Sequence, residues 1–449
     1  MWRCFIEPAA NRRDSSRLYN KRSIADLYTL LPQINWLEFL TRLIPPMIGT
    51  FLSNSTTVIV QEVDYLKNLS DLLRITSKRV VSNYIFWRIC HFWNDILDKS
   101  FDSVQLELMN VLNGQRKIVS RWQHCVQKCE ELLPAAVSAL FVRNHFDSNT
   151  KKEAMNLLTM IQKAFQGIVG KISWMDSDTK KFALQKASSI ISKVGYDKMS
   201  MNDTALDGYY AKLDIASSDT YFEVLRKTAA WNGKKHFSRL NKPFNKYEFT
   251  QSASTLNAYF THKMNSLCRA VNYGAIGFIM GHEMIHGFDD VGSAYDIDGN
   301  LHNWWSEESY QNFTNKTQCL IDQYGSYQVP NIDFKINGKL TLGENIADNG
   351  GIKQSYQAYQ EFISQSNQSE PVLPGMLDYT SDQIFFLSYA QIYCGHGTKS
   401  AQIEGILTDD HSPQRYRVNG PLSNLAEFSE AFDCPLGSNL NPIKRCSIW

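Results

Sequence analysis

Two histidines in the second half of the chain have the spacing of a metal site. The pentapeptide HEMIH at 282–286 places His282 and His286 four residues apart, so on a helix both imidazoles face the same side. Ala275, Phe278 and Ile279 fall on the same stripe, which predicts that the helix buries this face. Buried imidazoles need partners, and a shared metal ion would be one. The alternative is chance, because a chain with ten histidines can contain this pentapeptide by accident.

A second pair of acidic residues could complete the site. In GENIADNGG, residues 343–351, Glu344 and Asp348 are also four residues apart. A catalytic zinc site takes three protein ligands and keeps one open position, so we predict Glu344 as the third ligand. Asp348 is then predicted to accept a hydrogen bond from a ring N–H of His282. The spacing alone equally allows a solvated acidic helix face. The His-His-Glu set suits zinc best, although the ligands alone leave other divalent metals open.

The elements that must position these residues are mostly helices. Apolar residues recur at helical spacing over 154–168, and a further helix is predicted after Asp176. The pattern loosens over 196–245, a short strand is predicted at 255–260, and helices are predicted at 271–287 and 343–364. We therefore predict a mainly α protein with a small β component, with a helical domain at 1–215 and a metal-bearing domain at 216–449.

The composition bounds the partners and the compartment. Lys and Arg number 46 against 45 Asp and Glu, which gives no reason to expect nucleic acid or an anionic membrane surface as a partner. We expect no signal peptide and no membrane-spanning helix in this chain, because neither kind of apolar run occurs. None of the nine cysteines forms a CxxC pair or another close metal-binding spacing, which argues against a cysteine zinc site. Together with the Asn-x-Ser/Thr sequons, they favour an extracellular origin. The sequons start at Asn54, Asn68, Asn202, Asn312, Asn315 and Asn367.

Four segments of the chain resemble the neprilysin family, which includes neprilysin and endothelin-converting enzyme. They are VNYGAIGFIMGHEMIHGFDD (271–290), GENIADNGG (343–351), NAYF (257–260) and CSIW (446–449). The resemblance runs from LYNK at 18–21 to the last residue and is weaker in the first half. It implies a thermolysin-like catalytic domain beside a helical domain.

The resemblance also implies a catalytic set. One Zn²⁺ per chain would be held by His282, His286 and Glu344, with Glu283 as the general base for a zinc-bound water. The family's transition-state histidine matches His411, which joins Glu283 and Asp348 in the catalytic set. Without the resemblance, His411 would be taken for an ordinary loop residue.

Five further residues match the family's substrate-binding positions: Asn257, Ala258, Arg417, Ile279 and Tyr393. By resemblance, Asn257 and Ala258 bind the substrate backbone as an added strand would. Arg417 would bind a substrate carbonyl, and Ile279 and Tyr393 would line the S1′ pocket. The implied substrates are small peptides, cut on the amino side of bulky hydrophobic residues.

The chain departs from the family in three respects. Family members carry a membrane anchor or signal peptide followed by a long N-terminal part of the ectodomain, and we expect these to be missing here. The segment 260–271 is short, with THKMNSLCRA where the family has an edge strand containing FPAGILQ. By resemblance Cys319 pairs with Cys446, whereas the partners of three other cysteines fall in the missing part. These three are Cys125, Cys394 and Cys434.

Three functions follow as hypotheses. The first is a zinc metalloendopeptidase of the extracellular space or of a plasma-membrane ectodomain, with no membrane contact from this chain itself. The second is a catalytically impaired zinc-binding fragment or short isoform that acts as a peptide-binding decoy. The third is a structural or adhesive protein in which the HExxH is incidental.

Overall fold

The computed structural model describes residues 10–46, 51–93, 96–97, 100–243, 249, 252–254, 269–365 and 375–449. These residues form many helices and one two-stranded sheet, which confirms the predicted fold class. The predicted strand at 255–260, with Asn257 and Ala258, lies outside the described residues, as does nearly all of the short segment 260–271.

The chain packs as two compact units, each built from separate stretches of sequence. The first contains Met1–Val111, Gln115–Leu140 and Asp197–Ser252, and the second contains Leu112–Gly114, Phe141–Tyr196 and Ala253–Trp449. This division concerns packing, and the domain boundary at residue 215 stays a prediction. Among the described helices, none has the length and apolar character needed to cross a bilayer.

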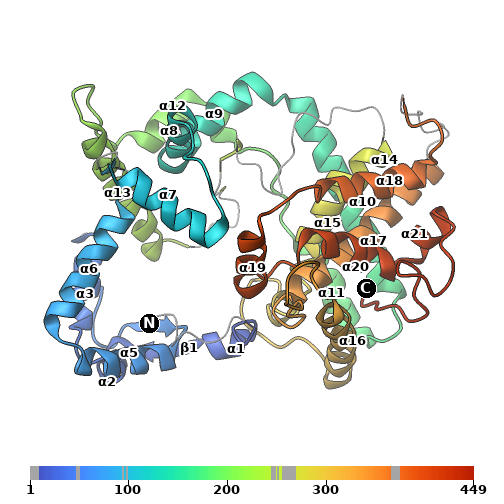
Figure 1. Cartoon of the computed structure of the whole chain (residues 1–449), viewed down its shortest axis with the longest axis horizontal. Helices are drawn as coiled ribbons and strands as arrows, with labels where there is room; N and C mark the ends of the chain where they lie inside the picture. The colour runs from blue at the N-terminus through green and yellow to red at the C-terminus, as the bar shows by residue number, and fades with distance from the viewer. Residues whose placement is uncertain are drawn as a thin grey trace. The chain divides into compact units, whose positions relative to one another are not determined.

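The first unit combines short helices with the sheet (Figure 1). Strand β1 (Asn20–Ser23) runs antiparallel to β2 (Thr57–Val60), with Asn20 opposite Val60. Ser23 then caps helix α2 and exchanges hydrogen bonds with Asp26 in a capping box, so the chain turns directly from strand to helix. The helices are α1 Ser15–Leu18, α2 Ile24–Leu30, α3 Trp36–Leu43, α5 Val63–Ile75, α6 Lys78–Phe92, α7 Ser100–Asn113, α8 Arg121–Leu132, α9 Pro134–His145, α12 Asp203–Tyr210 and α13 Tyr221–Phe237, with 3₁₀ turns Lys198–Met201 and Ser238–Asn241. The last residues of α7 and of α9 count with the second unit.

The second unit is a helical bundle. Its α-helices are α10 Ser148–Lys171, α11 Ser177–Ser189, α14 Arg269–Asn272, α15 Phe278–Ile285, α16 Glu307–Ser326, α17 Leu342–Gln365, α18 Ser381–Ile392, α19 Lys399–Thr408, α20 Gln414–Asn424 and α21 Ala426–Ala431. A π-helical turn at Tyr273–Gly277 and a 3₁₀ turn at Gly292–Ala294 complete it. The apolar residues predicted to share a face over 154–168 are largely buried along α10.

Helix α17 is the centre of this bundle. It packs against α15, α10, α16 and α20, which surround it in Figure 1. Around it, Phe165 of α10 contacts Phe288 with ring centroids 4.9 Å apart, and Trp449 packs against both rings. The disulfide Cys319–Cys446 joins α16 to the C-terminal segment, which confirms the expected pairing.

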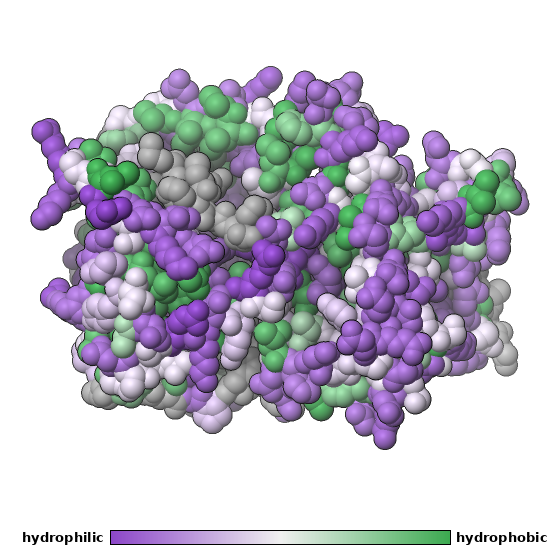
Figure 2. Space-filling view, turned by 90° about the horizontal axis from the view of Figure 1, so that it is seen from below, coloured by the Kyte–Doolittle hydropathy of each residue, from purple (hydrophilic) through white to green (hydrophobic). Residues whose placement is uncertain are grey.

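Figure 2 shows how hydrophilic and hydrophobic residues are distributed over one face of the molecule. The face in Figure 2 is mostly hydrophilic, with separate apolar patches between the polar side chains.

The cysteines at 125 and 394 are exposed and the one at 434 is half-buried, and all three carry free thiols.

Candidate metal centre

The HExxH pentapeptide lies on a helix that touches α17 backbone to backbone. The turn Tyr273–Gly277 joins α14 to α15 without a break, so the helix runs from Arg269 to Ile285. A Cβ on Gly281 would lie 2.9 Å from the carbonyl oxygen of Gly351, and one on Gly351 would lie 2.6 Å from the amide nitrogen of His282. Both positions therefore require glycine. Because the two helices cross so closely, the histidines of the HExxH pentapeptide lie near the first turn of α17, which contains Glu344.

The two imidazoles and the Glu344 carboxylate converge on one point. The Nε2 atoms of His282 and His286 are 3.1 Å apart. Oε2 of Glu344 lies 3.3 Å from Nε2 of His282, and Oε1 lies 3.4 Å from Nε2 of His286. A tetrahedral zinc ion with ligands at about 2.0–2.1 Å separates its donor atoms by about 3.3–3.4 Å. The three side chains thus fit a zinc ion, and the described residues contain this set as a possible metal site.

Each imidazole is turned toward that point by a carboxylate on its other nitrogen. Oδ1 of Asp348 lies 2.8 Å from Nδ1 of His282, and Oδ2 of Asp289 lies 2.8 Å from Nδ1 of His286. Both carboxylates are buried. A proton on each Nδ1 leaves the Nε2 lone pairs facing inward, as metal ligands require. Sequence reasoning named Asp348 but missed Asp289, although its i, i+3 spacing from His286 could have signalled it.

His411 and Arg417 approach the same carboxylates from the segment before α20 and from α20 itself. Nε2 of His411 lies 3.2 Å from Oε2 of Glu344, and its Nδ1 lies 2.7 Å from Oδ1 of Asp409. Arg417 donates from Nε and Nη2 to the two oxygens of Asp348, both at 2.8 Å. The hydroxyl of Tyr393 donates to Asp348 at 3.3 Å.

The charges of this cluster are strongly coupled. Burial disfavours the charged form of His282, but Asp348 and Glu344 outweigh it and raise the pKa of His282 to about 9. The hydrogen bond to Glu344 likewise raises the pKa of His411 to about 9 against the effect of burial. Burial alone would raise the pKa of Glu344, yet His282 and His411 hold it well below its usual range. Without a bound metal, Glu344 therefore stays ionised, and its negative charge can attract a metal cation.

The remaining predicted residues are placed as follows. Glu283 follows His282 on α15 and its side chain is exposed, whereas Ile279 is half-buried against the core. Tyr393 is half-buried, and its ring centroid lies 4.9 Å from Cζ of Arg417. Asn257 and Ala258 lie outside the described residues.

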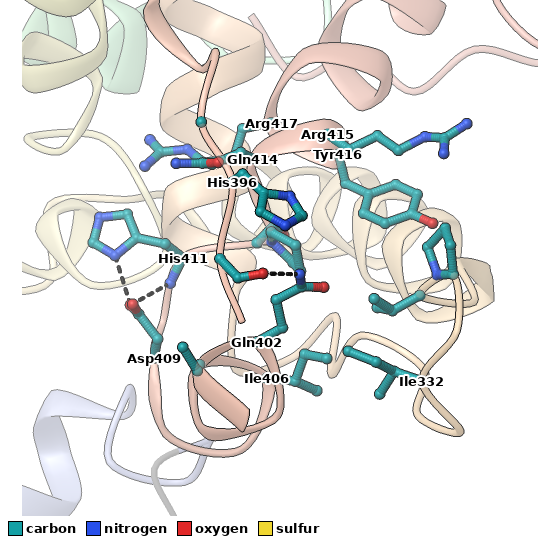
Figure 3. Close-up of a pocket in the computed structure, with 18 of the residues that line it drawn as sticks. Ile332, His396, Gln402, Ile406, Asp409, His411, Gln414, Arg415, Tyr416 and Arg417 are labelled. Atoms are coloured by element: carbon teal, nitrogen blue, oxygen red, sulfur yellow. Dashed lines mark hydrogen bonds and ion pairs between the residues drawn. The ribbon is translucent and has the colours of Figure 1, made fainter. Parts of the chain in front are cut away.

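A pocket of about 1000 Å³ opens beside the cluster. Tyr393, His411 and Arg417 belong to its wall, and the rest comes from residues 329–332, 394–409 and 412–416. Figure 3 shows His411 bonded to Asp409 on one side of the pocket, with Ile332 and Ile406 among the lining side chains. Sequence reasoning did not predict this wall, because loop 329–332 carries no pattern that marks a site.

Comparison with known proteins identifies the chain's relatives. Two family models described as Peptidase family M13 match residues 4–197 and 244–448. Neprilysin-11 of Caenorhabditis elegans is 41% identical over 98% of this chain and 53% of its own length. Endothelin-converting enzyme 1 of Rattus norvegicus is 37% identical over 98% of this chain and 59% of its own length. The chain thus spans little more than half the length of these relatives.

A solved structure agrees. The zinc metalloprotease Zmp1 of Mycobacterium tuberculosis, in complex with an inhibitor, is similar with a TM-score of 0.87 and 29% identity, over 100% of this chain and 69% of that chain. Sequence and fold therefore point to the same family over nearly the whole chain. The chain belongs to peptidase family M13, the neprilysin family of zinc metalloendopeptidases.

Proposed function

We propose that this chain is a zinc-dependent metalloendopeptidase that hydrolyses small peptides on the amino side of bulky hydrophobic residues. The observation that carries the proposal is the set of donor distances between His282, His286 and Glu344, which matches the edges of a zinc tetrahedron. Family membership supports the same chemistry. Because the chain spans only part of its relatives, its own activity has to be measured.

Each residue around the donor set has a proposed role. Zinc held there would polarise the scissile carbonyl and lower the pKa of water to about 7. Glu283, exposed beside His282, would take the proton of the attacking water and pass it to the leaving nitrogen. His411 would donate a hydrogen bond to the developing oxyanion. Arg417 uses Nε and Nη2 on Asp348, and its Nη1, which takes no part in those two bonds, would bind a substrate carbonyl.

The proposed substrate contacts extend the site. Asn257 and Ala258 would pair with the peptide backbone, and Ile279 and Tyr393 would contact the hydrophobic side chain that follows the cleaved bond. The pocket that contains His411 and Arg417 offers room for several peptide residues, since its volume is about 1000 Å³.

The test compares Glu283→Gln with the wild-type chain on a quenched peptide containing Phe or Leu. Zinc content is measured in both proteins, and Glu430→Gln on α21 is the matched control. Loss of the base is expected to lower kcat by about 100-fold to 10,000-fold with zinc still bound. If the wild-type chain holds one zinc and shows no cleavage that depends on Glu283, the proposal fails. Peptide binding without turnover would instead favour the zinc-binding decoy.

We also propose an extracellular or plasma-membrane ectodomain location. The disulfide Cys319–Cys446 supports it, because such bonds persist in oxidising compartments. Among the sequons, the side chains of Asn54 and Asn68 are exposed. The side chains of Asn202 and Asn315 are exposed too, but each accepts a hydrogen bond, from the amide of Ala205 and from Gln311 respectively. Asn312 donates to the carbonyl of Trp174 at 2.9 Å. Glycosylation should therefore occur at the first two, and glycosidase treatment of protein secreted from eukaryotic cells would reveal it. A secreted chain whose mass is unchanged by the glycosidase would contradict this expectation.

A further inference from the structure

We infer that Lys186, on helix α11 outside the metal centre, is a positioning residue that fixes the zinc ligand His286 through the turn that follows it. The inference rests on the proposed binding of zinc and does not require peptide cleavage. Lys186 acts on the backbone of Gly292, and Gly292 acts on Asp289.

The Lys186 ammonium is buried and bonded to the turn. Its Nζ donates to the carbonyl oxygen of Gly292 at 2.8 Å and also to that of Tyr295. The Nζ atom lies 5.2 Å from the centroid of the Phe288 ring and 5.4 Å from that of the Trp304 ring. A buried ammonium is costly unless carbonyls or aromatic faces replace its water, and here both do.

The same turn holds the carboxylate that orients His286. Oδ1 of Asp289 accepts from the amide nitrogens of Val291 at 2.8 Å and Gly292 at 2.6 Å. Oδ2 of Asp289 lies 2.8 Å from Nδ1 of His286. Gly292 therefore binds Asp289 through its N–H and Lys186 through its carbonyl. Lys186 is thus connected to the Asp289 carboxylate, which orients His286, by two hydrogen bonds through the single residue Gly292.

Gly292 is also pressed against the ligand itself. A Cβ at this position would lie 1.8 Å from the carbonyl oxygen of His286, so the turn folds directly onto the backbone of the ligand. With so little clearance, a shift of the turn moves either Asp289 or His286. The Lys186 bonds hold the backbone of this turn, and Trp304 adds a bond from Nε1 to the carbonyl of Tyr295 at 3.2 Å.

The lysine keeps its charge in this setting. Burial lowers the pKa of Lys186 to about 8, and the charges of Asp289 and Asp296 oppose that shift. At neutral pH the ammonium is therefore mostly charged and is attracted by the carboxylate of Asp289. A neutral side chain of the same length would leave two carbonyls without this donor and free the turn to move.

The test uses Lys186→Met, with Lys180→Met as the matched control. Lys180 lies on the same helix and donates to the carbonyl of Ile172 at 2.7 Å, remote from Asp289 in the bonding network. Zinc affinity is measured by competition with a chromogenic chelator, and ligand geometry by the visible spectrum of the cobalt-substituted protein. Lys186→Met is expected to weaken zinc binding about 10-fold to 100-fold and to shift the cobalt bands. Lys180→Met should change neither.

A double-mutant cycle separates positioning from a general structural role. If Lys186 acts through Asp289, its replacement should have little further effect on zinc affinity in an Asp289→Asn background. Lys186→Gln, which keeps an N–H donor group, provides a milder variant in case Lys186→Met does not fold, and should show a smaller loss of zinc affinity. Wild-type zinc affinity and cobalt spectrum in folded Lys186→Gln and Lys186→Met would overturn the inference. Equal effects of Lys180→Met, or full additivity with Asp289→Asn, would do the same.

Discussion

Nε2 of His282 lies 3.1 Å from Nε2 of His286, and the two rings are nearly perpendicular, with an angle of 88° between their planes. Since each Nδ1 faces a carboxylate, both Nε2 atoms are directed into the same small space. Two unprotonated nitrogens would repel each other there, and the raised pKa of His282 means that a proton relieves this repulsion when no metal is bound. The two imidazoles therefore already have the arrangement that metal binding requires.

Glu344→Gln should greatly weaken zinc binding. The variant keeps the size of the side chain and removes the negative charge that joins the two imidazoles, so the affinity should fall by at least about 100-fold. Chelator competition and metal analysis would measure it. Glu361→Gln, on the same helix α17, is the control and should bind zinc as the wild type does. Equal affinity in the two variants would show that Glu344 is not a ligand.

Gly351→Ala should disrupt the crossing of α15 and α17. The new Cβ would lie 2.6 Å from the amide nitrogen of His282, so the helices must separate. The expected loss is about 1–3 kcal/mol in the free energy of unfolding, together with weaker zinc binding. In contrast, Gly325→Ala on α16 meets nothing within 4 Å and should be neutral or stabilising. Denaturant titration of both variants decides it, and a Gly351→Ala protein as stable as Gly325→Ala would contradict the crossing.

Arg417→Met should destabilise the metal-free protein. It removes both bonds to Asp348, whose side chain is 0% exposed, and leaves that carboxylate without its guanidinium partner. Removing one partner of a buried pair lowers the free energy of unfolding by about 3–5 kcal/mol. Arg417→Lys should recover only part of this loss, because an ammonium cannot donate in parallel to both carboxylate oxygens as a guanidinium does. The neighbouring Arg415 is exposed, so Arg415→Met is the control. Equal unfolding midpoints for Arg417→Met and Arg415→Met would refute the pairing.

Asp176→Asn should lower stability in a way that depends on pH. Asp176 caps α11 and accepts from the hydroxyls of Ser306 and Ser309, which hold its pKa far below the ordinary value of 3.8. Because the folded pKa is depressed, the stabilisation is complete well above 3.8 and is lost as the pH falls below it. We expect a difference of about 1–3 kcal/mol between wild type and variant at pH 7.

Denaturant unfolding at pH 7 and at pH 3 measures this difference, which should be clearly smaller at the lower pH. Asp178→Asn is the matched control, because it removes an exposed carboxylate from the first turn of the same helix and leaves the bonds of Asp176 in place. A difference for Asp176→Asn that is the same at both pH values would contradict the assignment of the effect to its charge.

Local sequence patterns predicted the helices better than they predicted the supports of the metal centre. The i, i+4 spacings of His282 with His286 and of Glu344 with Asp348 require only a helix, and α15 and α17 provide it. The contact between Gly281 and Gly351 joins residues far apart in the sequence, so no local pattern can show it.

The same limit applies to the roles taken from the family. His411 and Arg417 come from loop and helix segments with no metal-site spacing of their own, and only the resemblance marked them in advance. Asp289 is different, since its separation of three residues from His286 was visible in the sequence. The direction of the Asp289 carboxylate could not be predicted from the sequence, because hydrogen bonds from backbone amides of the turn set it.

The discontinuity of the second unit has a practical consequence for expression. A gene fragment that begins at residue 253 would encode all three proposed zinc ligands, yet it would lack the stretch Phe141–Tyr196 that packs in the same unit. Such a fragment would leave Phe288 without Phe165, and the turn after His286 without Lys186. It should therefore aggregate when produced alone and be rescued by co-production of a peptide covering α10 and α11, as in split-protein complementation.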